Sequence, residues 1–232
     1  MEMYLFLLRW IHLLSGVTWI GLLYYFNLVQ TPFFAETDPA VRSGAVQKLV
    51  PRALWWFRWG AMFTFLSGIL IYLHRLGQLG WGGFFSTSYG WAITVGGLLG
   101  TLMFLNVWLV IWPKQKVVIA SATQVAQGGQ AIPEAAASAR RAALASRTNT
   151  VFSIPMLFYM GAASHLTIFA QPPEGASLRM TIALIAILGF LELNTLIGSQ
   201  GPTKKPLDSI AGALWSGFIL TLLLHGLFLT FF

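Results

Sequence analysis

The sequence contains no cysteine. This absence excludes disulfides, zinc–thiolate sites, iron–sulfur clusters and haem attached covalently through a Cys-x-x-Cys-His motif. Charged residues are also scarce, at 9% of the 232 residues, whereas a soluble domain has about 25%. Hydrophobic residues, by contrast, make up 56% of the chain. Together these values predict an all-α integral membrane protein rather than a soluble domain.

The apolar residues fall into six stretches, each near the ~20 residues that cross the hydrocarbon core as a helix. The stretches cover residues 4–29, 54–76, 90–113, 148–170, 179–199 and 208–231. We expect them to form a bundle of about six transmembrane helices, in a single domain over residues 1–232. The first stretch lacks the basic start and the small-x-small cleavage site of a signal peptide, so we expect it to be retained.

Lysine and arginine are distributed unevenly between the connections. Arg9, Arg75 and Arg179 lie on one side, and the other eleven basic residues lie on the opposite side. Because basic residues mark the cytoplasmic face, we expect a bacterial inner-membrane protein with both termini in the periplasm. The connection 114–147 is then cytoplasmic, and its Ala- and Gln-rich composition favours a solvated tether over a surface helix at 133–147. The net charge of +7 reflects topology and contacts with membrane lipid, not nucleic acid.

All four histidines lie in or at the end of apolar stretches. His12, His165 and His225 lie inside their stretches, and His74 ends another. The first three are roughly 8–12 Å from the periplasmic ends, within about one helical turn of each other in depth. Neutral imidazole is a common axial ligand of haem iron. We therefore expect one or two b-type haems, with His12 and His165 as the preferred pair, His225 in reserve and His74 least favoured.

Neighbouring residues agree with a haem on the periplasmic side. Gly16, Gly161 and Gly226 lie close to the histidines and leave space for a macrocycle, and Arg9 and Arg75 could bind the haem propionates. The alternative is a cofactor-free structural or accessory subunit, in which each histidine only hydrogen-bonds across helices.

A second polar group lies in the cytoplasmic halves of the stretches. Glu192 is the only acidic residue well inside one, and an intramembrane carboxylate is costly and usually functional. The other members are Asn27, Asn106, Asn149 and Asn194, with Arg147 at the cytoplasmic edge. Glu192 could carry protons, bind a substrate or pair with Arg58 or Arg147, and the whole group could instead only join helices.

Several motifs resemble the membrane domain of the bacterial membrane-bound urate hydroxylase (PuuD) family. They are Arg9-Trp10-Ile11-His12, Trp19-Ile20-Gly21, Trp56-Phe57-Arg58-Trp59, Asn106-Val107-Trp108, Ile111-Trp112-Pro113, Ser146-Arg147-Thr148-Asn149-Thr150, Ser153-Ile154-Pro155 and Ser164-His165. These motifs lie within residues 4–170. The chain resembles a short form of the family without the cytochrome c domain.

The resemblance implies urate oxidation on the cytoplasmic side. Electrons would pass to a periplasmic cytochrome c or other redox subunit, so the chain would be a membrane-embedded haem electron-transfer protein, alone or within a larger complex. Arg147, Asn106 and Asn149 would bind the planar anion. Glu192 and Asn106 would be catalytic, with Glu192 taking a proton during oxidation.

Overall fold

The computed structural model describes residues 2–232, which form helices and no strand. The α-helices are α1 Glu2–Tyr24, α2 Thr31–Glu36, α3 Pro39–Lys48, α4 Val50–Phe85, α5 Ser88–Leu105, α6 Trp112–Ala126, α7 Ala135–His165, α8 Ala176–Leu196 and α9 Ile210–Phe231. Two π-helices, η1 Tyr25–Gln30 and η2 Asn106–Ile111, join α1 to α2 and α5 to α6, and a 3-10 helix, η3 Pro202–Asp208, precedes α9. The all-α class is confirmed.

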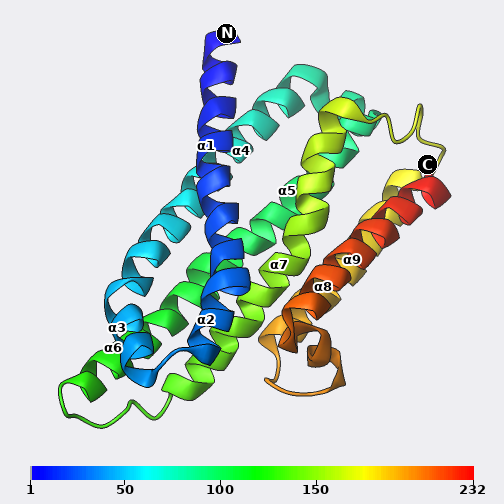
Figure 1. The fold of residues 1–232 in the computed structure, drawn as a ribbon. Helices are drawn as coiled ribbons and strands as arrows, with labels where there is room; N and C mark the ends of the chain where they lie inside the picture. The colour runs from blue at the N-terminus through cyan, green and yellow to red at the C-terminus, as the bar shows by residue number, and fades with distance from the viewer. Residues whose placement is uncertain (1) are drawn as a thin grey trace.

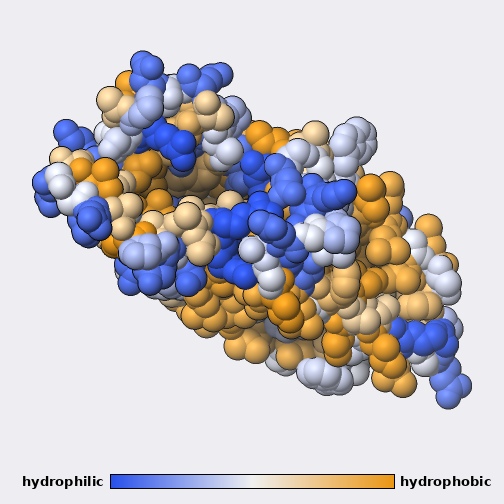
Figure 2. Space-filling model, turned by 90° about the horizontal axis from the view of Figure 1, so that it is seen from below, coloured by the Kyte–Doolittle hydropathy of each residue, from blue (hydrophilic) through white to orange (hydrophobic). Residues whose placement is uncertain are grey.

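The long helices lie side by side as a bundle, with both chain ends at the same end (Figure 1). The opposite end carries α2, α3, η3 and the turn 127–134 between α6 and α7, and we call it the polar end. Figure 2 looks at the polar end and shows hydrophilic side chains gathered on it, with apolar side chains on the flanks. A chain that crosses a membrane an even number of times is expected to have both termini at the same end of the bundle.

Five helices are long and apolar enough to cross a membrane, one fewer than the six expected. They are Met3–Glu36, Val50–Phe85, Ser88–Ala126, Ala176–Leu196 and Ile210–Phe231. The expected stretch 148–170 lies mostly on α7, which contacts α1, α5, α6, α8 and α9 and is therefore the central helix. Because neighbouring helices shield α7, its polar residues face protein instead of lipid, and its composition is less apolar.

Helices extend beyond the apolar stretches at the polar end. α6 continues to Ala126 and α7 begins at Ala135, so most of the connection 114–147 is helical. The tether favoured for residues 133–147 is wrong. Alanine is the strongest helix former, and Leu144 and Ala145 pack into the core with no exposed surface.

The two π-helices each precede a proline. Pro32 and Pro113 lie in the first turns of α2 and α6. Proline has no N–H for the helical ladder, and in both places a wider π turn lies just before it, so that the chain continues as helix. Helical structure therefore continues beyond the apolar stretch 90–113. The π turns also place Asn27 and Asn106 at irregular points of the bundle.

Small residues allow close backbone contact at the helix crossings. A Cβ on Gly60 of α4 would lie 3.1 Å from the Trp19 backbone nitrogen, and one on Gly217 of α9 would lie 2.9 Å from the Val151 carbonyl oxygen. On α5, a Cβ on Gly96 would lie 3.2 Å from the Met160 side chain of α7, whereas one on Gly100 would have no atom within 4 Å. Such contacts are how helices pack tightly without a hydrophobic driving force.

Candidate functional site

Three residues expected at the site converge from three elements. Asn106 of η2 donates from Nδ2 to Asn149 Oδ1 of α7 at 3.0 Å and to Glu192 Oε2 of α8 at 3.2 Å. Asn149 donates in turn to the Met103 carbonyl oxygen at 3.0 Å. Asn149 is fully buried and Glu192 half-buried. We call Asn106, Asn149 and Glu192 the amide–carboxylate cluster.

The cluster retains unused hydrogen-bonding capacity. Asn106 Oδ1 is buried and accepts no hydrogen bond, an arrangement that costs about 1–3 kcal/mol in a protein interior. Glu192 has no cationic partner, because the single ion pair within residues 2–232 joins Arg140 to Asp208 at 2.8 Å. The pairing of Glu192 with Arg58 or Arg147, considered from the sequence, is therefore absent from the described residues.

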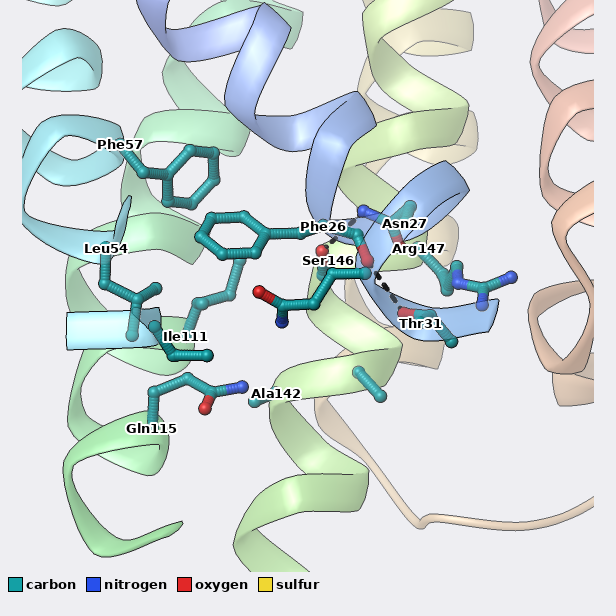
Figure 3. A pocket seen from close by; sticks show the side chains of 13 residues that line it. Phe26, Asn27, Thr31, Leu54, Phe57, Ile111, Gln115, Ala142, Ser146 and Arg147 are labelled. Carbon is teal, nitrogen blue, oxygen red and sulfur yellow. Dashed lines mark hydrogen bonds between the residues drawn. The ribbon is translucent and has the colours of Figure 1, made fainter. Parts of the chain in front are cut away.

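A cavity of about 130 Å³ lies at the same depth on a neighbouring face of α7 (Figure 3). Ser146 lines it, three positions before Asn149, which is about 60° around the helix. Both π-helices contribute to the wall. The lining residues are Phe26, Asn27, Gln30, Thr31, Val50, Leu54, Phe57, Ile111, Gln115, Ala142, Ala143, Ser146 and Arg147.

The cavity combines aromatic and amide side chains. Phe26 and Phe57 meet edge to face at 5.4 Å between ring centroids. Asn27 donates to the Leu23 carbonyl oxygen at 2.9 Å and to Ser146 Oγ at 2.8 Å, while Gln30 Oε1 is buried without a partner. Gln30, Gln115 and Ser146 were not among the site residues predicted from the sequence. The signal that could have found the first two is a proline within a continuous helical stretch, at Pro32 and Pro113.

Arg147 lies at the edge of this cavity and outside the amide–carboxylate cluster. It is 9% exposed, and its Nη1 is buried without a partner. In Figure 3 its guanidinium points away from Phe26 and Gln115. Asn149 is only two positions further along, but that is about 200° around the helix. The structure thus brings Asn106 and Asn149 together and separates Arg147 from them.

Basic residues hold the end of α8, one turn beyond Glu192. Lys204 Nζ donates to Asn194 Oδ1 at 3.1 Å and to the Ile197 carbonyl oxygen at 2.9 Å, and Arg141 donates to the Thr195 carbonyl oxygen. Burial lowers the pKa of Lys204, and the charges of Arg141 and Arg140 lower it further. Cations at a helix C-terminus satisfy its free carbonyls. Asn194 therefore serves the α8 end and not the cluster.

His12 has the hydrogen bond expected of an iron ligand. Its Nδ1 lies 2.9 Å from the Thr64 carbonyl oxygen and 3.3 Å from Ser67 Oγ. Because a carbonyl oxygen can only accept, Nδ1 carries the hydrogen and Nε2 keeps its lone pair. A backbone carbonyl commonly orients a metal-binding histidine in this way, so the chemistry of His12 fits an axial ligand.

The other histidines lie at different depths. His225 packs against Phe158 at 5.8 Å between ring centroids, and Phe158 precedes His165 by seven residues, or ~10 Å. The His74 ring lies beside Tyr4, with 6.5 Å between the ring centroids. Tyr4 precedes His12 by eight residues, or ~12 Å along α1. Two of the three histidines expected in one layer, His165 and His225, therefore differ in depth by ~10 Å, while His74 is shallower than His12, as expected.

The histidines divide between two helix pairs. His12 and His74 lie on α1 and α4, whereas His165 and His225 lie on α7 and α9, and α1 and α7 diverge toward the end that carries the termini (Figure 1).

His165 is exposed, and His74 Nε2 and His225 Nδ1 are buried without partners. Of the two arginines expected to bind haem propionates, Arg9 is exposed, and Arg75 donates a hydrogen bond from Nη1 to Gln78 Oε1 at 3.0 Å. Within residues 2–232, His, Cys, Asp and Glu form no group of three or more that could hold a metal ion. The axial pair remains a prediction.

The sequence model of the urate oxidase N-terminal family matches residues 80–198, just over half of the chain. The matched range contains η2, α7 and α8, and therefore the whole amide–carboxylate cluster. No curated protein and no solved structure matches the chain.

Proposed function

The chain belongs to the urate oxidase N-terminal family, and we propose that it is a membrane-embedded oxidoreductase unit that oxidises urate at its polar end and passes the electrons to a redox partner. The observation that carries the proposal is the cavity of about 130 Å³ beside the amide–carboxylate cluster. A cavity much smaller than a drug-sized pocket of ~300–1,000 Å³ favours a compact ring system as ligand.

The chemistry of the cavity suits a planar anion that carries ring N–H groups and carbonyl oxygens. Gln30 and Gln115 can each donate and accept in the plane of a purine ring, and Phe26 offers an aromatic wall. The excess of basic residues at the polar end raises the local concentration of anions. Arg147 contributes charge from the edge of the cavity, through a guanidinium nitrogen with no other partner.

The oxidation needs a proton acceptor and an electron acceptor. Addition of one oxygen atom from water to urate forms a carbon–oxygen bond and releases two protons and two electrons. Glu192 does not line the cavity, so in this proposal it takes one proton through a bridging water, with its carboxylate held by Asn106 at 3.2 Å. A b-type haem, when bound, supplies one-electron acceptor chemistry. His12 would ligate it in the sequence-based proposal, and a periplasmic cytochrome c would be the final acceptor.

Replacement of Gln115 by Leu tests the cavity as the urate site. We expect urate to bind about tenfold more weakly, because a ligand hydrogen bond worth about 1.4 kcal/mol is lost. Binding is measured by equilibrium dialysis with labelled urate against the purified protein. The control is Gln127→Leu, which changes the same residue type in the exposed turn at the polar end. Equal affinity in both variants would place the urate site elsewhere.

We propose further that the polar end faces the cytoplasm, as the distribution of lysine and arginine predicts. A reporter that is active only in the cytoplasm should be silent when fused after Phe232 and active when inserted near Gly128. The opposite pattern would place the cavity on the periplasmic face and remove cytoplasmic urate as its ligand.

A further inference from the structure

Arg58 is held by indole rings and by no anion. Its guanidinium carbon lies 4.0 Å from the ring centroid of Trp112, 5.2 Å from that of Trp108 and 5.9 Å from that of Trp59. Within residues 2–232 the guanidinium makes no hydrogen bond or ion pair, and its Nε is buried. A stacked guanidinium keeps its in-plane N–H donors available for a carboxylate or phosphate.

More unpaired donors and cations surround Arg58. Trp108 Nε1 is buried without a partner. Lys116 lies over the same indole as Arg58, with Nζ 5.6 Å from the Trp112 ring centroid. No carboxylate neutralises these two cations, because the ion pair of the described residues lies at Arg140 and Asp208. The site therefore has donors and positive charge for an anionic group that the chain itself does not supply.

An open groove adjoins this group on the outside of α4. It has a volume of about 360 Å³ and is lined by Pro51, Arg52, Trp55 and Trp56. Trp55 and Trp56 are 48% and 59% exposed. Trp55 packs against Trp59 at 6.3 Å, and Trp59 packs against Trp108 at 5.7 Å between ring centroids. The indoles thus connect the groove to Arg58, and five of the ten tryptophans of the chain gather here.

We propose that this surface, formed by Arg52, Trp55, Trp56, Arg58, Trp112 and Lys116, is a binding site for an anionic phospholipid. It lies where α4 and α6 enter the polar end, at the level expected for lipid headgroups. Indole rings favour this interfacial zone, and basic pockets between helices bind anionic headgroups. The lipid phosphate takes the free N–H donors of Arg58, and the exposed indoles of the groove cover its glycerol region.

Native mass spectrometry of the detergent-purified protein tests the site. Phosphatidylglycerol and phosphatidylcholine with identical acyl chains are added at equal concentration, and the retained lipid is counted. We expect the protein to retain phosphatidylglycerol in preference to phosphatidylcholine. In Arg58→Gln this preference should fall about fivefold, the effect of removing one basic residue that attracts an anionic headgroup. The matched control is Arg179→Gln, which removes an arginine stacked on Phe231 at 5.7 Å at the other end of the bundle.

Two outcomes overturn the proposal. One is equal retention of phosphatidylglycerol by Arg58→Gln and Arg179→Gln. The other is displacement of the lipid by inorganic phosphate at the same concentration, which indicates a free-anion site. If Arg58→Gln does not elute as a folded protein, Lys116→Gln carries the comparison. Retention of phosphatidylglycerol by Lys116→Gln at the level of the unchanged protein then refutes the site.

Discussion

Glu192→Gln is expected to slow urate-driven reduction of the electron acceptor by at least about 100-fold, the range for loss of a general base. The carboxylate is the only acidic group well inside a span, and Gln keeps its shape but cannot take a proton. The bond from Asn106 to Glu192 Oε2 can be kept by the Gln side-chain oxygen, so the helices should remain packed. The rate is measured by stopped-flow absorbance of the purified protein with a soluble one-electron acceptor.

Glu134→Gln is the control for this change. Glu134 is exposed in the turn at the polar end, so its loss should leave the rate unchanged. Asn106→Ala should also slow the reaction, because it removes both bonds that hold Glu192 and Asn149 in place. If Glu192→Gln oxidises urate at the full rate, Glu192 only joins helices and another group accepts the proton.

His12→Ala is expected to abolish the reduced-state α-band of the purified protein. The carbonyl of Thr64 holds the His12 ring with Nε2 available, which is the form that coordinates haem iron. His165→Ala should have the same effect if the preferred pair is correct, whereas His74→Ala should keep the band. The spectra are recorded on protein that elutes as a single folded species.

The four single histidine variants together identify the axial pair. Loss of the band in His12→Ala and His74→Ala would place the haem between α1 and α4, and loss in His165→Ala and His225→Ala would place it between α7 and α9. A purified wild-type protein with no haem spectrum would refute the haem proposal and favour the cofactor-free subunit. Urate binding at the cavity would still be open to its own test.

The sequence by itself determined the helical class and one polar group that includes the three residues of the amide–carboxylate cluster, together with Asn27, Asn194 and Arg147, which lie outside it. Asn106, Asn149 and Glu192 lie in the same half of three apolar stretches. A polar side chain at that depth must face another polar group, because lipid offers no hydrogen bonds. Depth along the helix therefore placed these residues in one polar group, and the structure joins these three by hydrogen bonds of 3.0 and 3.2 Å.

Only the tertiary structure decided which residues face one another around each helix. Arg147 and Asn149 are close in sequence and in depth, but the rotation of about 100° per residue turns Arg147 away from the cluster. His12 and His165 were matched by depth, whereas their helices α1 and α7 diverge toward the end that carries the termini (Figure 1). The cavity depends on two π turns at Tyr25–Gln30 and Asn106–Ile111, which follow from how the bundle accommodates Pro32 and Pro113. Hydropathy indicates only the depth of a residue along its helix. The direction in which each side chain points is decided by how the helices pack against one another.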